Sequence, residues 1–249
     1  MCLVLFAYRS LPDIPLLVAA NRDEFHQRAA ASAAWWQDHE TVLAGRDLVA
    51  GGTWLGCTKS GRFAALTNMS GADDPATPTS RGSLVQNFLI GGDTAESYAT
   101  NLDGSPFAGF NLLVFDGQAL WLTSNRGPTQ ELQPGVYGLS NTVFGTPWPK
   151  CVQGAELLAE SGSRDPRDTA ALLDIMADAS VPPDEALPQR GRPLDFERRV
   201  APRFILGDEY GTRASTIVVV AADTIHFTEQ SYQANGQAAG QVTYDFGRE

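Results

Sequence analysis

The order of apolar segments along the chain constrains its fold more than any other feature. Short apolar runs joined by tight turns come in groups, and pairs of segments with helical spacing lie between the groups. Strands joined by short turns pair antiparallel, so the groups predict mostly antiparallel sheets. The segments with strand character are 2–8, 15–20, 51–58, 61–69, 109–117, 119–125, 135–141, 212–221, 224–232 and 240–246.

The helical segments come in two pairs, 81–90 with 94–102, and 147–160 with 165–179. In the last of these, Asp165 is placed to cap the helix and Pro166 fits its first turn. Residues 180–203 are rich in Pro and Arg and predict a loop. The economical architecture is α+β, a four-layer αββα sandwich of two facing sheets with helices outside. We find no linker and no internal repeat, so residues 1–249 are expected to form a single domain.

Composition and charge limit which binding partners and which cellular compartment are expected. The formal net charge of −11, without a local cluster of basic residues, argues against nucleic acid. Three widely spaced cysteines without a CxxC motif predict a reducing compartment. The chain shows no signal peptide and no apolar run that spans a bilayer. We therefore expect a cytoplasmic protein with a small-molecule substrate or ligand, whereas the oligomeric state is not indicated.

Cys2, which directly follows the initial methionine, is the first candidate for chemistry. Removal of Met1 would leave a residue that has both a thiol nucleophile and an α-amine to act as its base. Such an amine has a pKa of roughly 7.7–8.0, which suits a base near neutral pH. A cysteine at the head of an apolar strand is equally typical of core packing. Both interpretations stay open at this point.

The polar run NRDE at 21–24 ends an apolar strand. In an antiparallel hairpin the end of the second strand lies opposite the start of the first, which predicts Asn21–Asp23 beside Cys2. A neighbouring guanidinium favours the thiolate, so Arg22 is a candidate partner of the thiol. Asp23 is a candidate for orienting the α-amine or the arginine. The usual alternative is a solvated hairpin end.

Four further side chains are candidates. Asn68 ends FAALTN and Asn141 ends GLSN, where an Asn amide can stabilise an oxyanion, although a turn residue is the commoner role. Arg213 precedes the last buried strand, either as a surface residue or as an anion clamp. Trp54 in GGTWLG packs in the core or lines a pocket.

The sequence lacks the motifs that are typical of several kinds of metal, nucleotide-binding and catalytic sites. The three histidines lack the spacing of a metal site, and no P-loop, GxGxxG or GxSxG motif occurs. We therefore expect no metal and no required cofactor.

Many ordered motifs resemble the NRDE family, which includes the Transport and Golgi organisation protein 2 homologues. The resemblance runs from residue 1 to about 246. The motifs are MC, AANRDEF, GGTWLG, ALTN, SRG, GFNLL, NRG, GVYGLSN, TPWPK and YGTR.

This resemblance implies a fold and a site. NRDE proteins are grouped with the N-terminal-nucleophile hydrolase superfamily, which has the αββα sandwich. In its cysteine members, such as bile salt hydrolases and penicillin V acylases, the site comprises an N-terminal Cys, an Arg and an Asp after the next strand, an Asn and a late Arg. The similar positions here are Cys2, Arg22, Asp23, Asn68, Asn141 and Arg213. Those hydrolases separate the Arg from the Asp by two residues, whereas Arg22 and Asp23 are adjacent, so Asn21 and Glu24 remain further candidates.

Two hypotheses for the function follow. The first is a cysteine hydrolase of a non-peptide amide or a thioester, with an acyl-CoA-like or lipid-like substrate. The second is a non-catalytic carrier, since the resemblance connects the family with Golgi organisation, lipid and acyl-CoA metabolism and intracellular haem trafficking. The carrier's candidate residues are Trp35, Trp36, Trp54 and Arg213 for the pocket, and Cys2, His26 and Cys57 as axial haem ligands.

Overall fold

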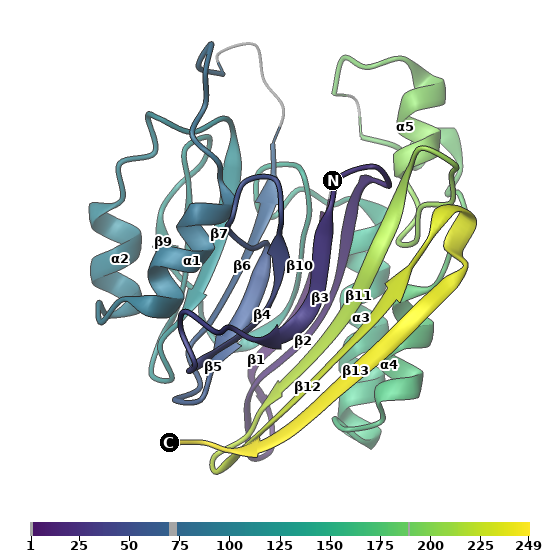
Figure 1. Cartoon of the computed structure of the whole chain (residues 1–249). Helices are drawn as coiled ribbons and strands as arrows, with labels where there is room; N and C mark the ends of the chain where they lie inside the picture. Colours follow the sequence, from purple (N-terminus) through teal and green to yellow (C-terminus); the bar gives the residue numbers. More distant parts are fainter. Residues whose placement is uncertain (1, 70–73, 189) are drawn as a thin grey trace.

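The computed structural model describes residues 2–69, 74–188 and 190–249. Within these ranges the strands form two sheets, one of six strands and one of seven, and the strand pairs in both are antiparallel. Helices cover the outer face of each sheet (Figure 1). The expected four-layer αββα sandwich is therefore confirmed.

The six-stranded sheet, called sheet A below, has the order β10-β1-β2-β11-β12-β13. Its central strands are almost completely buried along most of their length, because both faces of the sheet are covered. This explains why they read as continuous apolar runs rather than as alternating ones. The strands are β1 (Cys2–Leu11), β2 (Ile14–Phe25), β10 (Gly135–Leu139), β11 (Tyr210–Val220), β12 (Thr224–Tyr232) and β13 (Ala238–Gly247).

The seven-stranded sheet, called sheet B, runs in sequence order from β3 to β9. The sequence did not predict β3, β4 and β9. The segment AASAAW of β3 is rich in alanine, and β4 contains Gly45, so neither has strong strand propensity. The strands are β3 (Ala30–Trp35), β4 (Val42–Asp47), β5 (Leu55–Thr58), β6 (Phe63–Asn68), β7 (Phe110–Phe115), β8 (Leu120–Ser124) and β9 (Gln130–Glu131).

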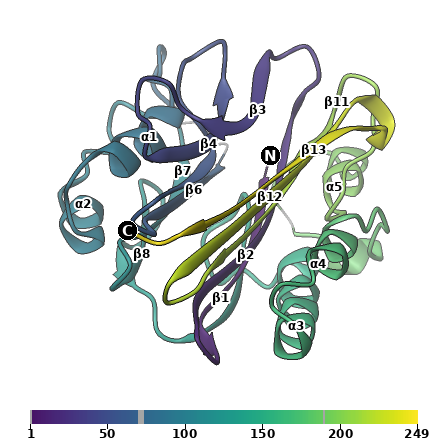
Figure 2. The ribbon, with the colours of Figure 1, turned by 60° about the horizontal axis from the view of Figure 1, so that its bottom comes forward.

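The helices lie in two outer layers, which Figure 2 shows on opposite sides of the sheets. Helices α1 (Gly82–Ile90) and α2 (Ala95–Asn101) pack on sheet B. Helices α3 (Pro149–Arg164) and α4 (Thr169–Met176) pack on sheet A, and α5 (Leu194–Val200) lies beyond them.

Two helix predictions need correction. Helix α4 is capped by Asp168, whose side chain accepts a hydrogen bond from the Ala171 N–H at 3.0 Å, and not by Asp165. Residues 180–203 are not all loop, because α5 forms there after Pro193. Its acids lie in the first turn and its arginines in the last, which complements the helix dipole.

The core consists of three apolar layers. The middle layer lies between the sheets and contains Phe6, Phe63, Phe115 and Phe227, all fully buried. The outer layers lie between each sheet and its helices. Among the described residues, none of the helices combines the length and the apolar character needed to cross a bilayer.

The strand register positions the polar run NRDE. Cys2 pairs with Arg22 across β1 and β2, and Leu3 pairs with Asn21, as the hairpin predicted. On the other side of β2, Thr212 of β11 pairs with Asp23. The register then shifts between Thr212 and Ala214, which marks a β-bulge at Arg213. A bulge changes the direction of the side chain that it carries, and no pattern in the sequence predicts it.

Candidate functional site

A cavity of about 390 Å³ opens where β1 begins and β2 ends. Sheet A contributes Cys2, Arg22, Asp23 and Glu24 to its lining. The opposite wall comes from sheet B, its loops and the start of α1. That wall includes Asp47, Ala50, Thr53, Trp54, Leu66, Asn68, Thr79, Ser80, Arg81 and Gly82. The cavity therefore lies at the seam between the two sheets.

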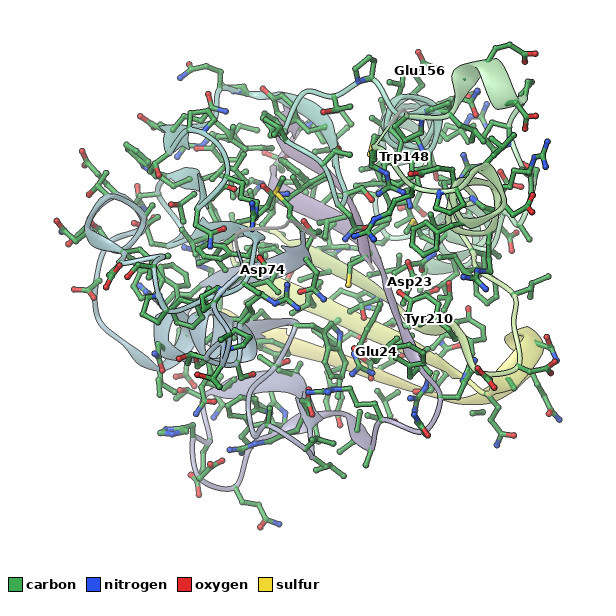
Figure 3. The ribbon with its side chains drawn as sticks, turned by 90° about the horizontal axis from the view of Figure 1, so that it is seen from above. Asp23, Glu24, Asp74, Trp148, Glu156 and Tyr210 are labelled. Carbon is green, nitrogen blue, oxygen red and sulfur yellow. The ribbon has the colours of Figure 1, made fainter. Side chains whose placement is uncertain are left out.

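Figure 3 looks down on this end of the molecule. Asp23, Glu24 and Tyr210 lie close together in this view, and Asp74 lies apart from them. The hydroxyl of Tyr210 donates to the backbone oxygen of Asp23 at 3.1 Å, which holds the ends of β2 and β11 together.

Cys2 is the first residue of β1, and hydrogen bonds to its backbone hold it in place. Its N–H donates to Oδ1 of Asn141 at 3.3 Å, and its carbonyl accepts from Oγ of Ser140 at 2.9 Å. The side chain is 8% exposed. Burial raises the pKa of the Cys2 thiol, and the charge of Arg22 opposes this effect. The thiol is therefore placed at the cavity but is mainly neutral in this environment at pH 7.

The two predicted asparagines have different surroundings. Asn141 is fully engaged: Oδ1 accepts from Cys2, and Nδ2 donates to the Asn68 carbonyl at 2.6 Å. The side chain of Asn68 lines the cavity, and no hydrogen bond from any described residue engages it. Asn141 thus positions the Cys2 nitrogen, whereas the Asn68 amide is available to a bound molecule.

A buried polar network that sequence reasoning missed fixes Asn141. Nδ2 of Asn111 donates to Oγ1 of Thr67 and to the carbonyls of Ser140 and Thr142, at 3.0–3.1 Å. Thr67 also donates to the Ser140 carbonyl at 2.6 Å. The signal was present in GFNLL, because a polar residue inside a buried strand needs partners.

Arg22 lies over the face of the Trp54 ring, beside Cys2. Its guanidinium carbon is 4.1 Å from the ring centroid of Trp54, and the residue is 6% exposed. In the described ranges the guanidinium makes no hydrogen bond and no ion pair. Gly45 makes room for the indole, since a Cβ there would lie 2.4 Å from a Trp54 ring carbon.

Asp23 is 2% exposed, and its Oδ1 accepts from Oγ1 of Thr212 at 2.7 Å. Burial raises the pKa of Asp23, which the charge of Lys150 partly offsets. Lys150 is itself buried, with Nζ donating to the Val200 carbonyl at 2.9 Å. Sequence reasoning assigned no role to this lysine, although it belongs to the motif TPWPK.

Three residues of the predicted site lie outside the cavity lining: Asn141, described above, Arg213 and Asn21. Arg213, on the bulge, donates through Nη1 to the carbonyls of Phe25, His26 and Arg28, so it holds the turn after β2. Asn21 points to the other face of sheet A. It donates to the carbonyls of Met176 and Arg203 and accepts from Ser215. The predicted set is therefore brought together only in part.

Other lining residues were not predicted. Arg28 pairs with Asp47 at 2.8 Å across the cavity edge. Arg81, from the motif SRG, donates through Nη1 to the Gly109 carbonyl at 2.9 Å. Trp35 and Trp36 are not among the lining residues: Trp35 packs on Phe246, and Trp36 donates to the Ala44 carbonyl.

Comparison with known proteins gives the family. Residues 1–234 match the family Transport and Golgi organisation 2. The chain belongs to this family. The Transport and Golgi organization protein 2 homologue of Bos taurus is 36% identical over 270 residues, covering 98% of this chain and 97% of its own. The Homo sapiens homologue is 34% identical over 272 residues, covering 99% of both chains. The Drosophila melanogaster protein is 29% identical, covering 93% of this chain and 92% of its own.

Solved structures show the same fold for this Transport and Golgi organisation 2 member. The Caenorhabditis elegans N-acylethanolamine-hydrolyzing acid amidase orthologue has a TM-score of 0.51 at 12% identity, covering 87% of this chain and 92% of its own. The C2A mutant of the conjugated bile acid hydrolase from Clostridium perfringens has a TM-score of 0.53 at 9% identity, covering 99% and 92%. At such identities the likeness concerns the fold, and it confirms the N-terminal-nucleophile hydrolase-like architecture.

Proposed function

We propose that this chain is an N-terminal cysteine hydrolase of a non-peptide amide or a thioester with a lipid-like acyl group. The observation that carries the proposal is the position of Cys2. Its side chain lines a cavity, its nitrogen is held by Asn141, and its strand partner is Arg22. Of the two proteins that share the fold, one is named as an amidase that hydrolyses N-acylethanolamines and the other as a hydrolase of conjugated bile acids, which supports the choice of an acyl bond.

The mechanism starts with removal of Met1, which frees the α-amine of Cys2. The thiol proton passes to this amine as Sγ attacks the carbonyl carbon. Asn68 donates to the resulting oxyanion. The C–N or C–S bond then breaks, and the proton moves from the amine to the departing nitrogen or sulfur. Water attacks the acyl thioester, with the amine again as base, and releases the acid and the thiol.

The surrounding residues would tune these steps. Arg22 favours the thiolate, against the desolvation that raises the pKa of Cys2. Asp23, buried next to the strand end, orients the α-ammonium that forms when the thiol proton is transferred. Asn141 accepts a hydrogen bond from the same nitrogen, and so limits the directions in which the amine presents its lone pair.

The test combines mass, labelling and turnover, on protein carrying a tag only at its C-terminus. We expect an intact mass without Met1, and alkylation of Cys2 by iodoacetamide faster than that of Cys57 or Cys151. Cys151 is the matched control, because burial raises its pKa to about 11. An N-acyl amine and acyl thioester panel should be hydrolysed by the Cys151→Ser protein and not by Cys2→Ala. Full turnover by Cys2→Ala would exclude the proposal.

A carrier of haem or of an acyl-CoA-like lipid is the second candidate, and the raised pKa of the Cys2 thiol favours the lipid carrier over hydrolysis. A largely neutral thiol is a poor nucleophile but does not hinder the binding of a lipid, whereas ligation of haem iron requires the thiol to lose its proton. For haem, Cys2 is the axial ligand that the cavity lining offers, since His26 and Cys57 are not part of that lining. Titration decides: a shifted Soret band, or saturable acyl-CoA binding without turnover, supports the carrier, and absence of both excludes it.

A further inference from the structure

The guanidinium of Arg22 is the feature of the cavity that most needs an explanation. Buried arginines normally have their donors satisfied, because an unmet charged donor costs more than a neutral one. Arg22 is only 6% exposed, and its guanidinium makes no hydrogen bond to a described residue. None of its nitrogens is among the fully buried atoms without a partner, so these donors face the open cavity. Its close partner there is the face of Trp54.

The acids near Arg22 are engaged with other groups. Oε1 of Glu24 accepts from the Phe25 N–H at 2.9 Å. Asp47 pairs with Arg28 at 2.8 Å and also caps its own turn through the N–H groups of Val49 and Ala50. Within the described part of the chain, the positive charge of Arg22 therefore faces the cavity without a direct counter-ion.

A second group of donors lies on the opposite wall. Arg81 lines the cavity and uses Nη1 for the Gly109 carbonyl. It directly precedes Gly82, the first residue of α1, and a helix N-terminus favours negative charge. Gly52 brings the Trp54 loop onto this helix start, since a Cβ at Gly52 would lie 2.5 Å from the Gly82 carbonyl carbon.

We propose that the molecule bound in this cavity carries an anionic group, a carboxylate or a phosphate, which the Arg22 guanidinium binds through two parallel hydrogen bonds while Arg81 faces it from the other wall. The planar guanidinium matches both anions, and its cation–π contact with Trp54 holds it at the cavity wall. Cys2 and Arg22 are directly paired across β1 and β2, so their Cβ atoms are about 4.5–5.5 Å apart. The anionic group therefore lies next to the bond that Cys2 attacks.

This inference rests on the proposed function for the position of the reacting bond, but anion binding is measured without turnover. The probes are sodium phosphate and sodium acetate, with sodium chloride at the same ionic strength as the reference. The background is the Cys2→Ala protein, which cannot form an acyl intermediate. Binding is read as the anion-dependent rise of the unfolding midpoint and by calorimetric titration.

Three variants in that background separate Arg22 from general charge. Arg22→Gln should weaken binding of the preferred anion by roughly 10- to 100-fold, the loss expected for charge-assisted hydrogen bonds. Arg22→Lys keeps the charge but loses the fork, so its affinity should fall between those of Arg22→Gln and the parent. Arg9→Gln removes one positive charge at the far end of β1 and should bind as the parent does. A preference for phosphate over acetate, or the reverse, names the group.

Unchanged binding in Arg22→Gln, or an equal loss in Arg9→Gln, would overturn the anion site. So would saturation by neither phosphate nor acetate beyond the chloride reference. If phosphate or acetate binds through Arg22 while the protein with intact Cys2 hydrolyses no acyl substrate, the proposed hydrolysis fails and the anion site stands.

Discussion

At the scale of single residues, burial shifts the pKa values of the ionisable side chains at the site. Cys2 and Asp23 are both removed from water, so the pKa of each is raised. Arg22 is also buried, and burial lowers its pKa. A fold optimised only for stability would not keep these groups together, since each loses hydration without full compensation. Their retention is what a functional site would require.

Asp23→Asn should stabilise the protein at neutral pH. The pKa of Asp23 is raised by burial in the folded state, so the wild type loses stability as pH increases from about 3.8 to the folded pKa. The variant lacks this loss. Its advantage should grow by about 1.4 kcal/mol for each pH unit between the unfolded and the folded pKa, and then stay constant. Urea unfolding between pH 4 and 8 measures it.

Asp178→Asn is a control variant, for which we expect the opposite change in stability. Its carboxylate accepts from Arg203 at 2.6 Å, and its pKa is lowered. The stability that Asp178 contributes is present above the unfolded pKa and is lost on acidification, so Asp178→Asn should be the less stable protein at pH 7. Equal pH profiles for Asp23→Asn and the wild type would contradict the assigned burial effect.

At the scale of elements, the loop after β10 determines where Asn141 lies. β10 ends at Leu139, and the next residues have no ladder to hold them. Asn111 and Thr67 supply that support from sheet B, across the seam between the sheets. The position of the Cys2 nitrogen in sheet A therefore depends on two side chains of the other sheet.

Asn111→Ala should free this loop and change the reactivity of Cys2. The carbonyls of Ser140 and Thr142 lose a donor, which costs about 1–3 kcal/mol of folding free energy. Asn125→Ala is the matched control, because the Asn125 amide also has three acceptors, all of them carbonyls, but lies away from the cavity. Both variants should lose stability in urea unfolding, and only Asn111→Ala should alter the alkylation rate of Cys2. Equal alkylation rates would argue against the positioning role.

Elements whose positions depend on local sequence could be predicted, and those that depend on packing could not. The hairpin of β1 and β2 follows from its turn and its two apolar runs, and this placed Arg22 opposite Cys2. Trp54 was ambiguous, because whether it meets the cavity depends on how sheet B lies on sheet A. Arg213 was assigned to the site by motif order, whereas a one-residue bulge directs it to the turn after β2.

At the scale of the whole molecule, the apolar layer between the two sheets packs them against each other in a single buried cluster. Phe63 of sheet B and Phe6, Val18 and Phe227 of sheet A belong to the same buried cluster. The expected single domain requires that neither sheet unfolds without the other. Sequence order predicted the two sheets, because hairpins recur along it, but the pairing of β1 with β10 joins segments too distant for any local pattern.

Phe63→Ala tests this cooperativity. Truncating a fully buried Phe should cost about 3–5 kcal/mol, and the transition should remain single. Far-ultraviolet circular dichroism and tryptophan fluorescence should give coincident urea curves in both wild type and variant. Val49→Ala, at a residue 64% exposed, should change stability by less than about 0.5 kcal/mol. Separate transitions for the two probes would show two independently folding parts.

The cavity at the seam has a consequence for finding the ligand. Cys2 and Arg22 belong to one sheet, whereas Trp54, Asn68 and Arg81 belong to the side of the other. A bound molecule therefore contacts both halves of the sandwich and must be released before they separate. Binding therefore stabilises the protein against thermal unfolding. The gain increases with the logarithm of the ratio of the ligand concentration to its dissociation constant. Heating the protein with candidate metabolites would thus rank them by affinity before any reaction has been identified.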